Sequence, residues 1–137
     1  MVENSELIHA LRPVLEELDR LGVRYCIGGS VASSCHGAAR STLDVDLVAE
    51  LNEAAALRMI SALRDAYYIS DSAVRETVQR KSCFNLLHLA TSFKVDVFVS
   101  RDREFDRSVQ DRAGVVMLGE TEPISARVVS AEDIVLT

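Results

Sequence analysis

Two short apolar segments of this chain carry aspartates at positions that a β-strand would turn toward one face. Residues 44–47 read Asp-Val-Asp-Leu, and residues 94–99 read Lys-Val-Asp-Val-Phe-Val with Asp96 at their centre. Side chains at i and i+2 of a strand lie on the same side, so Asp44 and Asp46 would share one face. Because an unpaired carboxylate is costly to bury, these segments predict a sheet with one packed face and one face that binds a charged partner.

The acids themselves indicate what that partner is. If the strand that carries Asp96 lies beside the strand that carries Asp44 and Asp46, three carboxylates converge. Like charges at close range are stable only with bound cations or raised pKa values. Mg²⁺ prefers oxygen ligands and commonly takes one or two protein carboxylates together with substrate phosphates. The three aspartates are therefore candidate ligands of Mg²⁺ or Mn²⁺.

A glycine-rich turn precedes the acids and is a candidate phosphate site. The apolar run 23–27 leads into Gly28, Gly29 and Ser30, and small residues follow, which predicts a strand-to-helix turn. Glycines allow a phosphate to approach the backbone, and a helix N-terminus offers free N–H groups. Lys94 shares a strand face with Asp96 and is either its ion-pair partner or a phosphate contact. A plain tight turn is the alternative interpretation of the glycines.

The ordered set of motifs resembles a known family. Gly-Gly-Ser at 28–30 is followed by Arg-Ser-Thr-Leu-Asp-Val-Asp at 40–46 and by the isolated Asp96 in a later strand. This order is similar to the nucleotidyltransferase fold of the polymerase-β type, over residues 23–100. The Arg-x-Thr-x-Asp-x-Asp variant is most similar to small bacterial AbiEii-like and related nucleotidyltransferases, some of which are toxins of toxin–antitoxin pairs.

The resemblance implies a fold and a reaction. The fold is α/β (α+β), with a mixed sheet flanked by helices. The reaction moves a nucleoside monophosphate from a nucleoside triphosphate to an acceptor hydroxyl on a tRNA, a protein or a small molecule. Asp44, Asp46 and Asp96 would be the catalytic, metal-binding residues. Arg40 and Thr42 would join Gly28, Gly29, Ser30 and Lys94 as nucleotide-binding residues.

Two other functions remain open at this point. One is a non-catalytic binding module with the same fold, such as one half of a toxin–antitoxin pair. The other is an antibiotic nucleotidyltransferase of the aminoglycoside type, since an acidic protein attracts cationic substrates. The chain has 15 basic and 21 acidic residues, a formal net charge of −6, which disfavours a broad polynucleotide-binding surface.

Length and hydropathy suggest how the chain is organised. A chain of 137 residues predicts a single domain over 1–137. A capping-box pattern at 130–133 predicts a final helix, and the sequence ends at Thr137 within about two turns of its start. We therefore expect the domain to be either a natural minimal form or truncated. No signal peptide or membrane span is recognisable, and an odd number of cysteines, Cys26, Cys35 and Cys83, indicates reduced thiols. We therefore expect a cytoplasmic protein without a membrane partner.

The periodicity of apolar residues predicts an alternating order of elements. Helices are expected at 5–21, in a short stretch after Gly29, and at 53–66, 71–79 and 104–112. Pro13 should either kink the first helix or start its second segment. Strands are expected at 23–27, 43–49, 67–69, 83–89, 93–99, 115–118 and 126–129. The strands 83–89 and 93–99, with a polar turn at Thr91 and Ser92, predict a β-hairpin.

Overall fold

The computed structural model describes residues 5–28, 44–69, 71–119, 123–130 and 133. Its elements follow one another in an alternating order that agrees closely with the periodicity of the sequence. They are α1 (Ser5–Arg20), β1 (Tyr25–Gly28), β2 (Asp44–Ala49), α3 (Glu53–Leu63), β3 (Tyr67–Tyr68), α4 (Asp71–Arg80), β4 (Cys83–His88), β5 (Lys94–Val99), α5 (Glu104–Arg112), β6 (Gly114–Leu118) and β7 (Ile124–Val128). The helices expected after Gly29 and after Ser130 lie outside the described residues, Asp133 excepted.

The strands form one mixed sheet in the order β3-β4-β5-β2-β1-β7-β6. β4 and β5 are antiparallel, which confirms the expected hairpin. β2 lies parallel to β5 on one side and antiparallel to β1 on the other, so it occupies the centre of the sheet. This arrangement confirms the α/β class with a mixed sheet.

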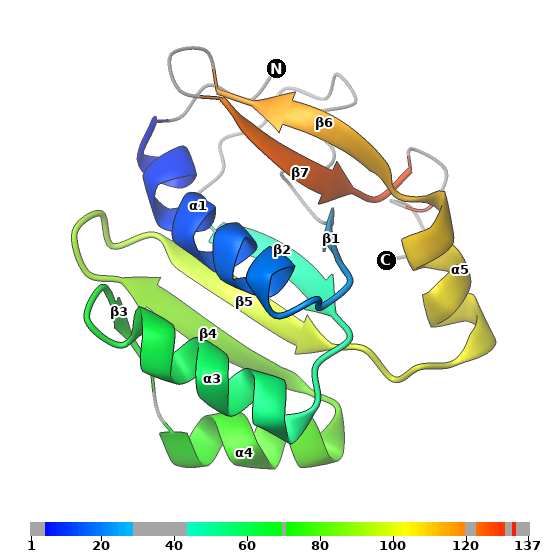
Figure 1. Cartoon of the computed structure of the whole chain (residues 1–137), viewed down its shortest axis with the longest axis horizontal. Helices are drawn as coiled ribbons and strands as arrows, with labels where there is room; N and C mark the ends of the chain where they lie inside the picture. The colour runs from blue at the N-terminus through cyan, green and yellow to red at the C-terminus, as the bar shows by residue number, and fades with distance from the viewer. Residues whose placement is uncertain (1–4, 29–43, 70, 120–122, 131–132, 134–137) are drawn as a thin grey trace.

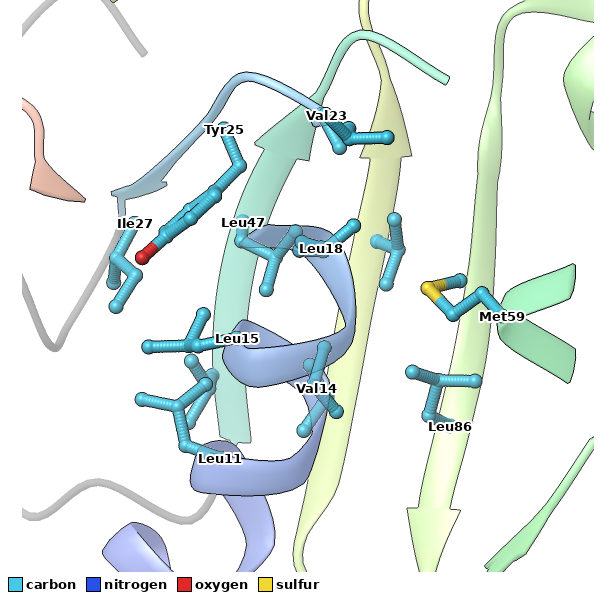
Figure 2. Packing of buried hydrophobic residues seen from close by; sticks show 14 of the residues in the cluster. Leu11, Val14, Leu15, Leu18, Val23, Tyr25, Ile27, Leu47, Met59 and Leu86 are labelled. Carbon is cyan, nitrogen blue, oxygen red and sulfur yellow. The ribbon is translucent and has the colours of Figure 1, made fainter. Parts of the chain in front are cut away.

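The described helices α1, α3 and α4 lie on one face of β2, β4 and β5. In Figure 1, α1 lies over β2 and β5, and α3 and α4 continue the same layer toward β4. Leu7, Leu11, Val14 and Leu18 recur at helical spacing in α1, and all four are fully buried. Figure 2 shows Leu11, Val14 and Leu18 of this stripe between α1 and the strands β2 and β5. The other face of β4, β5 and β2 carries their polar side chains.

Local chemistry sets the ends of the helices. The structure has one α-helix through Pro13, so this proline does not begin a separate segment. α3 begins as expected, because the side chain of Asn52 accepts a hydrogen bond of 2.8 Å from the Ala55 N–H. It ends at Leu63, three residues before the expected end, and a turn closed by the Ala66 N–H to the Leu63 carbonyl leads into β3.

An ion pair between a buried carboxylate and a half-buried arginine joins α5 to the segment that follows β7. Arg112 donates two hydrogen bonds, of 2.8 and 2.7 Å, to the Asp133 carboxylate, and the Ser130 hydroxyl donates a third of 2.8 Å. Asp133 is 1% exposed. These donors stabilise the ionised carboxylate, so the pKa of Asp133 lies below its ordinary value, chiefly because of the hydrogen bonds from Arg112.

Asp133→Asn is expected to destabilise the fold by about 1.5 to 3 kcal/mol at neutral pH, since it weakens hydrogen bonds to a charged group. A lowered pKa means that the carboxylate stabilises the fold above its unfolded-state pKa and loses this effect as the pH falls through the folded-state value. The difference in free energy of unfolding between wild type and variant should therefore narrow below about pH 4. Urea unfolding at pH 7 and pH 3 measures it, and a difference that is the same at both values would contradict the pairing.

No helix among the described residues is both long enough and apolar enough to cross a membrane.

Candidate active site

The parallel pairing of β2 with β5 places two of the candidate aspartates opposite each other. Asp46 and Asp96 are Cα partners in this register, and Asp44 is the partner of Lys94. In both strands the intervening valines are fully buried against the helices, whereas the four charged residues are exposed or half-buried. Side chains therefore alternate between the two faces as the sequence predicted, and the acids lie on the face opposite the described helices.

Asp46 is the central acid of this face. Its pKa is raised, first because burial disfavours the charged carboxylate, then because of the charge of Asp96 and the hydrogen bond with it. Asp44 raises the pKa further and Lys94 lowers it. A divalent cation bound between these acids would lower the pKa of Asp46 again, because it would favour the ionised forms of the carboxylates.

Lys94 lies between the acids of the two strands. Its Nζ is 3.7 Å from Asp44 Oδ2 and 3.9 Å from Asp96 Oδ1. The ion pair with Asp96 was one of the two interpretations of the sequence, and the structure adds Asp44 as a second partner. Lys94 thus contributes a positive charge at the point where the carboxylates would otherwise only repel each other.

One residue of the site was not singled out from the sequence. Asn85 of β4 is the Cα partner of Asp96, and its amide Nδ2 donates a hydrogen bond to Asp96 Oδ1. An asparagine on a strand gives no signal of its own, because it is equally typical of a solvated face. The register of the hairpin is the only feature that could have pointed to it.

Gly28, the described residue of the expected glycine turn, lies opposite an acid at the end of β1. Gly28 is the Cα partner of Asp46, and a Cβ added at Gly28 would have no heavy atom within 4 Å. The backbone at Gly28 is therefore open to a ligand, as a phosphate-binding turn requires. The other candidates, Gly29, Ser30, Arg40 and Thr42, lie outside the described residues, and their roles stay predictions.

A hollow of about 450 Å³ opens beside Asp46, on the side of the C-terminal ends of β2 and β5. Its lining combines apolar side chains and the thiol of Cys83 with basic groups and the carboxylate of Asp106. The lining residues of interest are Gly28, Val48, Cys83, Phe98, Lys81 and Arg101. Burial raises the pKa of Cys83 to about 11, helped by the charges of Asp96 and Asp46, so this thiol is a poor nucleophile at neutral pH. A volume of this size is typical of small-molecule sites.

The donor set suits Mg²⁺ only in part. Among the described residues, no three His, Cys, Asp or Glu side chains are placed to hold one ion together. The close pair is Asp46 and Asp96, and two carboxylates are what Mg²⁺ commonly takes from a protein, with water and phosphate oxygens completing its shell. The pair, with its raised pKa at Asp46, therefore fits such an ion, whereas the convergence of all three aspartates on it stays a prediction.

Comparison with known proteins identifies the fold. No protein-family model matches the sequence, and no curated protein is detectably similar to it. Among solved structures, TM1012 of Thermotoga maritima, assigned as a nucleotidyltransferase, matches with a TM-score of 0.61 and 15% identity over 99% of this chain and 84% of that one. The lincosamide antibiotic adenylyltransferase LnuA, in its lincomycin-bound form, matches with a TM-score of 0.57 and 16% identity over 98% and 85% of the two chains.

A third match is an antigenic nucleotidyltransferase-like protein from Paracoccidioides brasiliensis, with a TM-score of 0.58 and 17% identity over 97% of this chain and 64% of that one. At such identities, structural similarity is evidence about architecture. Taken with the mixed sheet and the pairing of β2 with β5, these matches show that the chain has the nucleotidyltransferase fold.

Proposed function

We propose that this protein is a metal-dependent nucleotidyltransferase, which moves a nucleoside monophosphate from a nucleoside triphosphate to an acceptor hydroxyl. The observation that carries the proposal is the placement of Asp46 opposite Asp96 on neighbouring parallel strands, next to the open backbone of Gly28. Two acids in one half-buried place are unfavourable for folding alone, so their position is better explained by a bound cation and a phosphate.

Each part of the site then has a role in the transfer. A bond forms between the acceptor oxygen and the α-phosphorus, and the bond from that phosphorus to the bridging oxygen breaks, so that pyrophosphate leaves. Asp44 and Asp46 would hold Mg²⁺ or Mn²⁺ with the triphosphate, and Asp96 would be a ligand of the ion on the acceptor side and would accept the hydroxyl proton of the acceptor. Bound divalent cations would neutralise charge on the attacking and leaving oxygens. Gly28, with Gly29 and Ser30, would hold the β- and γ-phosphates.

The acceptor side of the proposal is less specific. The hollow beside Asp46 is large enough for a nucleoside or a small acceptor, with Phe98 as an apolar surface for a ring. The net charge of −6 favours a small acceptor over a long nucleic acid. LnuA, which has this fold, is an antibiotic adenylyltransferase, and this likeness keeps an antibiotic acceptor among the candidates. The AbiEii-like subfamily, a cognate toxin or antitoxin and a cytoplasmic location are further proposals that rest on the sequence.

The direct experiment is to incubate the protein with each α-labelled nucleoside triphosphate and Mg²⁺, together with total tRNA, a protein extract and a panel of small hydroxyl compounds. Labelled product from one triphosphate supports the proposal and identifies the acceptor class. Absence of transfer to every class, from a protein that also fails to bind nucleotide, would refute it. Nucleotide binding without any transfer would favour the binding module.

Asp46→Asn is expected to abolish the stabilisation that Mg²⁺ and a nucleoside triphosphate give to the wild type. A ligand that binds only the folded state stabilises it by mass action, by about 2.7 kcal/mol at a concentration of about 100 Kd. Thermal melts with and without the ligands measure the effect. The variant should melt no lower than wild type without ligands, because it removes a carboxylate whose pKa burial and Asp96 raise. An undiminished ligand shift in the variant would exclude Asp46 as a metal ligand.

A further inference from the structure

Three aspartates share the face of β2 and β5 opposite the described helices, and Lys94 lies among them. Asp46 and Asp96 are directly opposite each other, and Asp44 is opposite Lys94. Without a bound cation the repulsion between these carboxylates has to be offset by the protein itself. Among the residues that the structure describes, the Lys94 ammonium is the positive charge paired with these acids, at 3.7 Å from Asp44 on β2 and at 3.9 Å from Asp96 on β5.

The oxygens that Lys94 contacts are the same kind of donor that a divalent cation needs. Asp96 Oδ1 accepts a hydrogen bond from Asn85, and the Lys94 ammonium lies 3.9 Å from the same oxygen, within ion-pair range. Asp44 Oδ2 contacts the same ammonium. A metal ion that draws on these oxygens brings two further positive charges next to Lys94, and the two cations repel each other.

We propose that Lys94 is the internal counter-ion of the carboxylates in the metal-free protein, and that a divalent cation has to displace it in order to bind. This inference rests on the proposed metal site. The Lys94 side chain is 42% exposed and sits on a flexible stem, so it can move into solvent without disturbing the strand. The lysine therefore stabilises the empty site and lowers the affinity of the site for a divalent cation given alone.

The test is a titration of the full chain with Mn²⁺ alone, in which the electron paramagnetic resonance signal of the free ion measures binding. It is done at low ionic strength, where salt screens the interaction between charges only weakly. Lys94→Met should bind Mn²⁺ at least about fivefold more tightly than wild type. This factor corresponds to the loss of one attraction between two unit charges about 4 Å apart in bulk water. Lys94→Arg keeps the charge and should stay close to wild type.

The chain offers a matched control. Arg20 at the end of α1 is 65% exposed and pairs with Glu17 on the same helix. Arg20→Met makes the same change in net charge outside the hollow beside Asp46, so its affinity for Mn²⁺ should remain close to that of wild type. Equal tightening in both methionine variants would mean that overall charge, and not the position of Lys94, controls binding, and would overturn the proposal.

Thermal melts give a second and independent readout. Without metal, Lys94→Met should melt below wild type, because the carboxylates lose their counter-ion. Saturating Mn²⁺ should raise its melting temperature more than that of wild type, because the metal no longer competes with an ammonium. Unchanged melts and an unchanged Mn²⁺ affinity in Lys94→Met would overturn the proposal. If Asp46→Asn nevertheless loses Mn²⁺ binding, the metal site itself stands; if Asp46→Asn binds as wild type does, the metal site fails as well.

Discussion

Asp96→Asn should keep nucleotide affinity within a few fold and lose nucleotidyl transfer by orders of magnitude. The proposed role of Asp96 is on the acceptor side, where it accepts a proton and meets charge that develops only in the transition state. An asparagine is close to isosteric but cannot accept that proton. Fluorescence titration with a nucleoside triphosphate measures binding, and single-turnover transfer of label measures the rate.

Asp102→Asn is a suitable control for this variant. Asp102 is an exposed acid three residues beyond β5, and its backbone has a φ of 59°, which asparagine tolerates well. The control makes the same chemical change near the site and should leave transfer intact. Loss of nucleotide affinity in Asp96→Asn in parallel with the rate would place Asp96 on the triphosphate side instead, and an unaffected rate would remove it from the reaction.

Leu47→Ala should lower the free energy of unfolding by about 2 to 5 kcal/mol, the range typical of a leucine truncated in a packed core. Leu47 directly follows Asp46 and is fully buried on the face of β2 that packs against α1. Figure 2 shows Leu47 next to Leu18 of α1. The loss combines the transfer free energy of the removed carbons with the cavity that they leave. Urea unfolding followed by circular dichroism measures it.

The same truncation on the other side of the sheet provides the comparison. Leu87 of β4 is 37% exposed, so Leu87→Ala should cost no more than about 1 kcal/mol, since little apolar area leaves contact with the protein. Similar losses in the two variants would contradict the assignment of one packed and one open face. The result matters for function, because packing of Leu47 is what turns Asp46 outward.

Sequence patterns were sufficient for those parts of the fold that depend on local periodicity. The alternation in residues 94–99 predicted which side chains of β5 are buried, and the hairpin with β4 follows from a short polar turn. Helix ends were predicted less accurately. α3 ends at Leu63 because a turn, closed by the hydrogen bond from the Ala66 N–H to the Leu63 carbonyl, leads into β3. The periodicity of apolar residues does not predict such a turn.

The non-local parts of the site could not be derived in the same way. Proximity of Asp96 to Asp46 depends on parallel pairing between strands about fifty residues apart, which no local pattern determines, and it was stated only as a condition. The contacts of Lys94 with Asp44 and of Asn85 with Asp96 follow from the exact registers of two strand pairs. These contacts are set by the packing of the whole sheet, and only the resemblance to a family indicated that the acids meet.

The parallel pairing of β2 with β5 has a consequence for how the protein is made. During synthesis Asp44 and Asp46 emerge long before Asp96, and α3, β3, α4 and β4 all lie between them in the chain. Closing that crossover is a long-range event, which comes late in folding compared with helix and hairpin formation. A nascent chain therefore lacks the complete set of proposed site residues until β5 has docked beside β2.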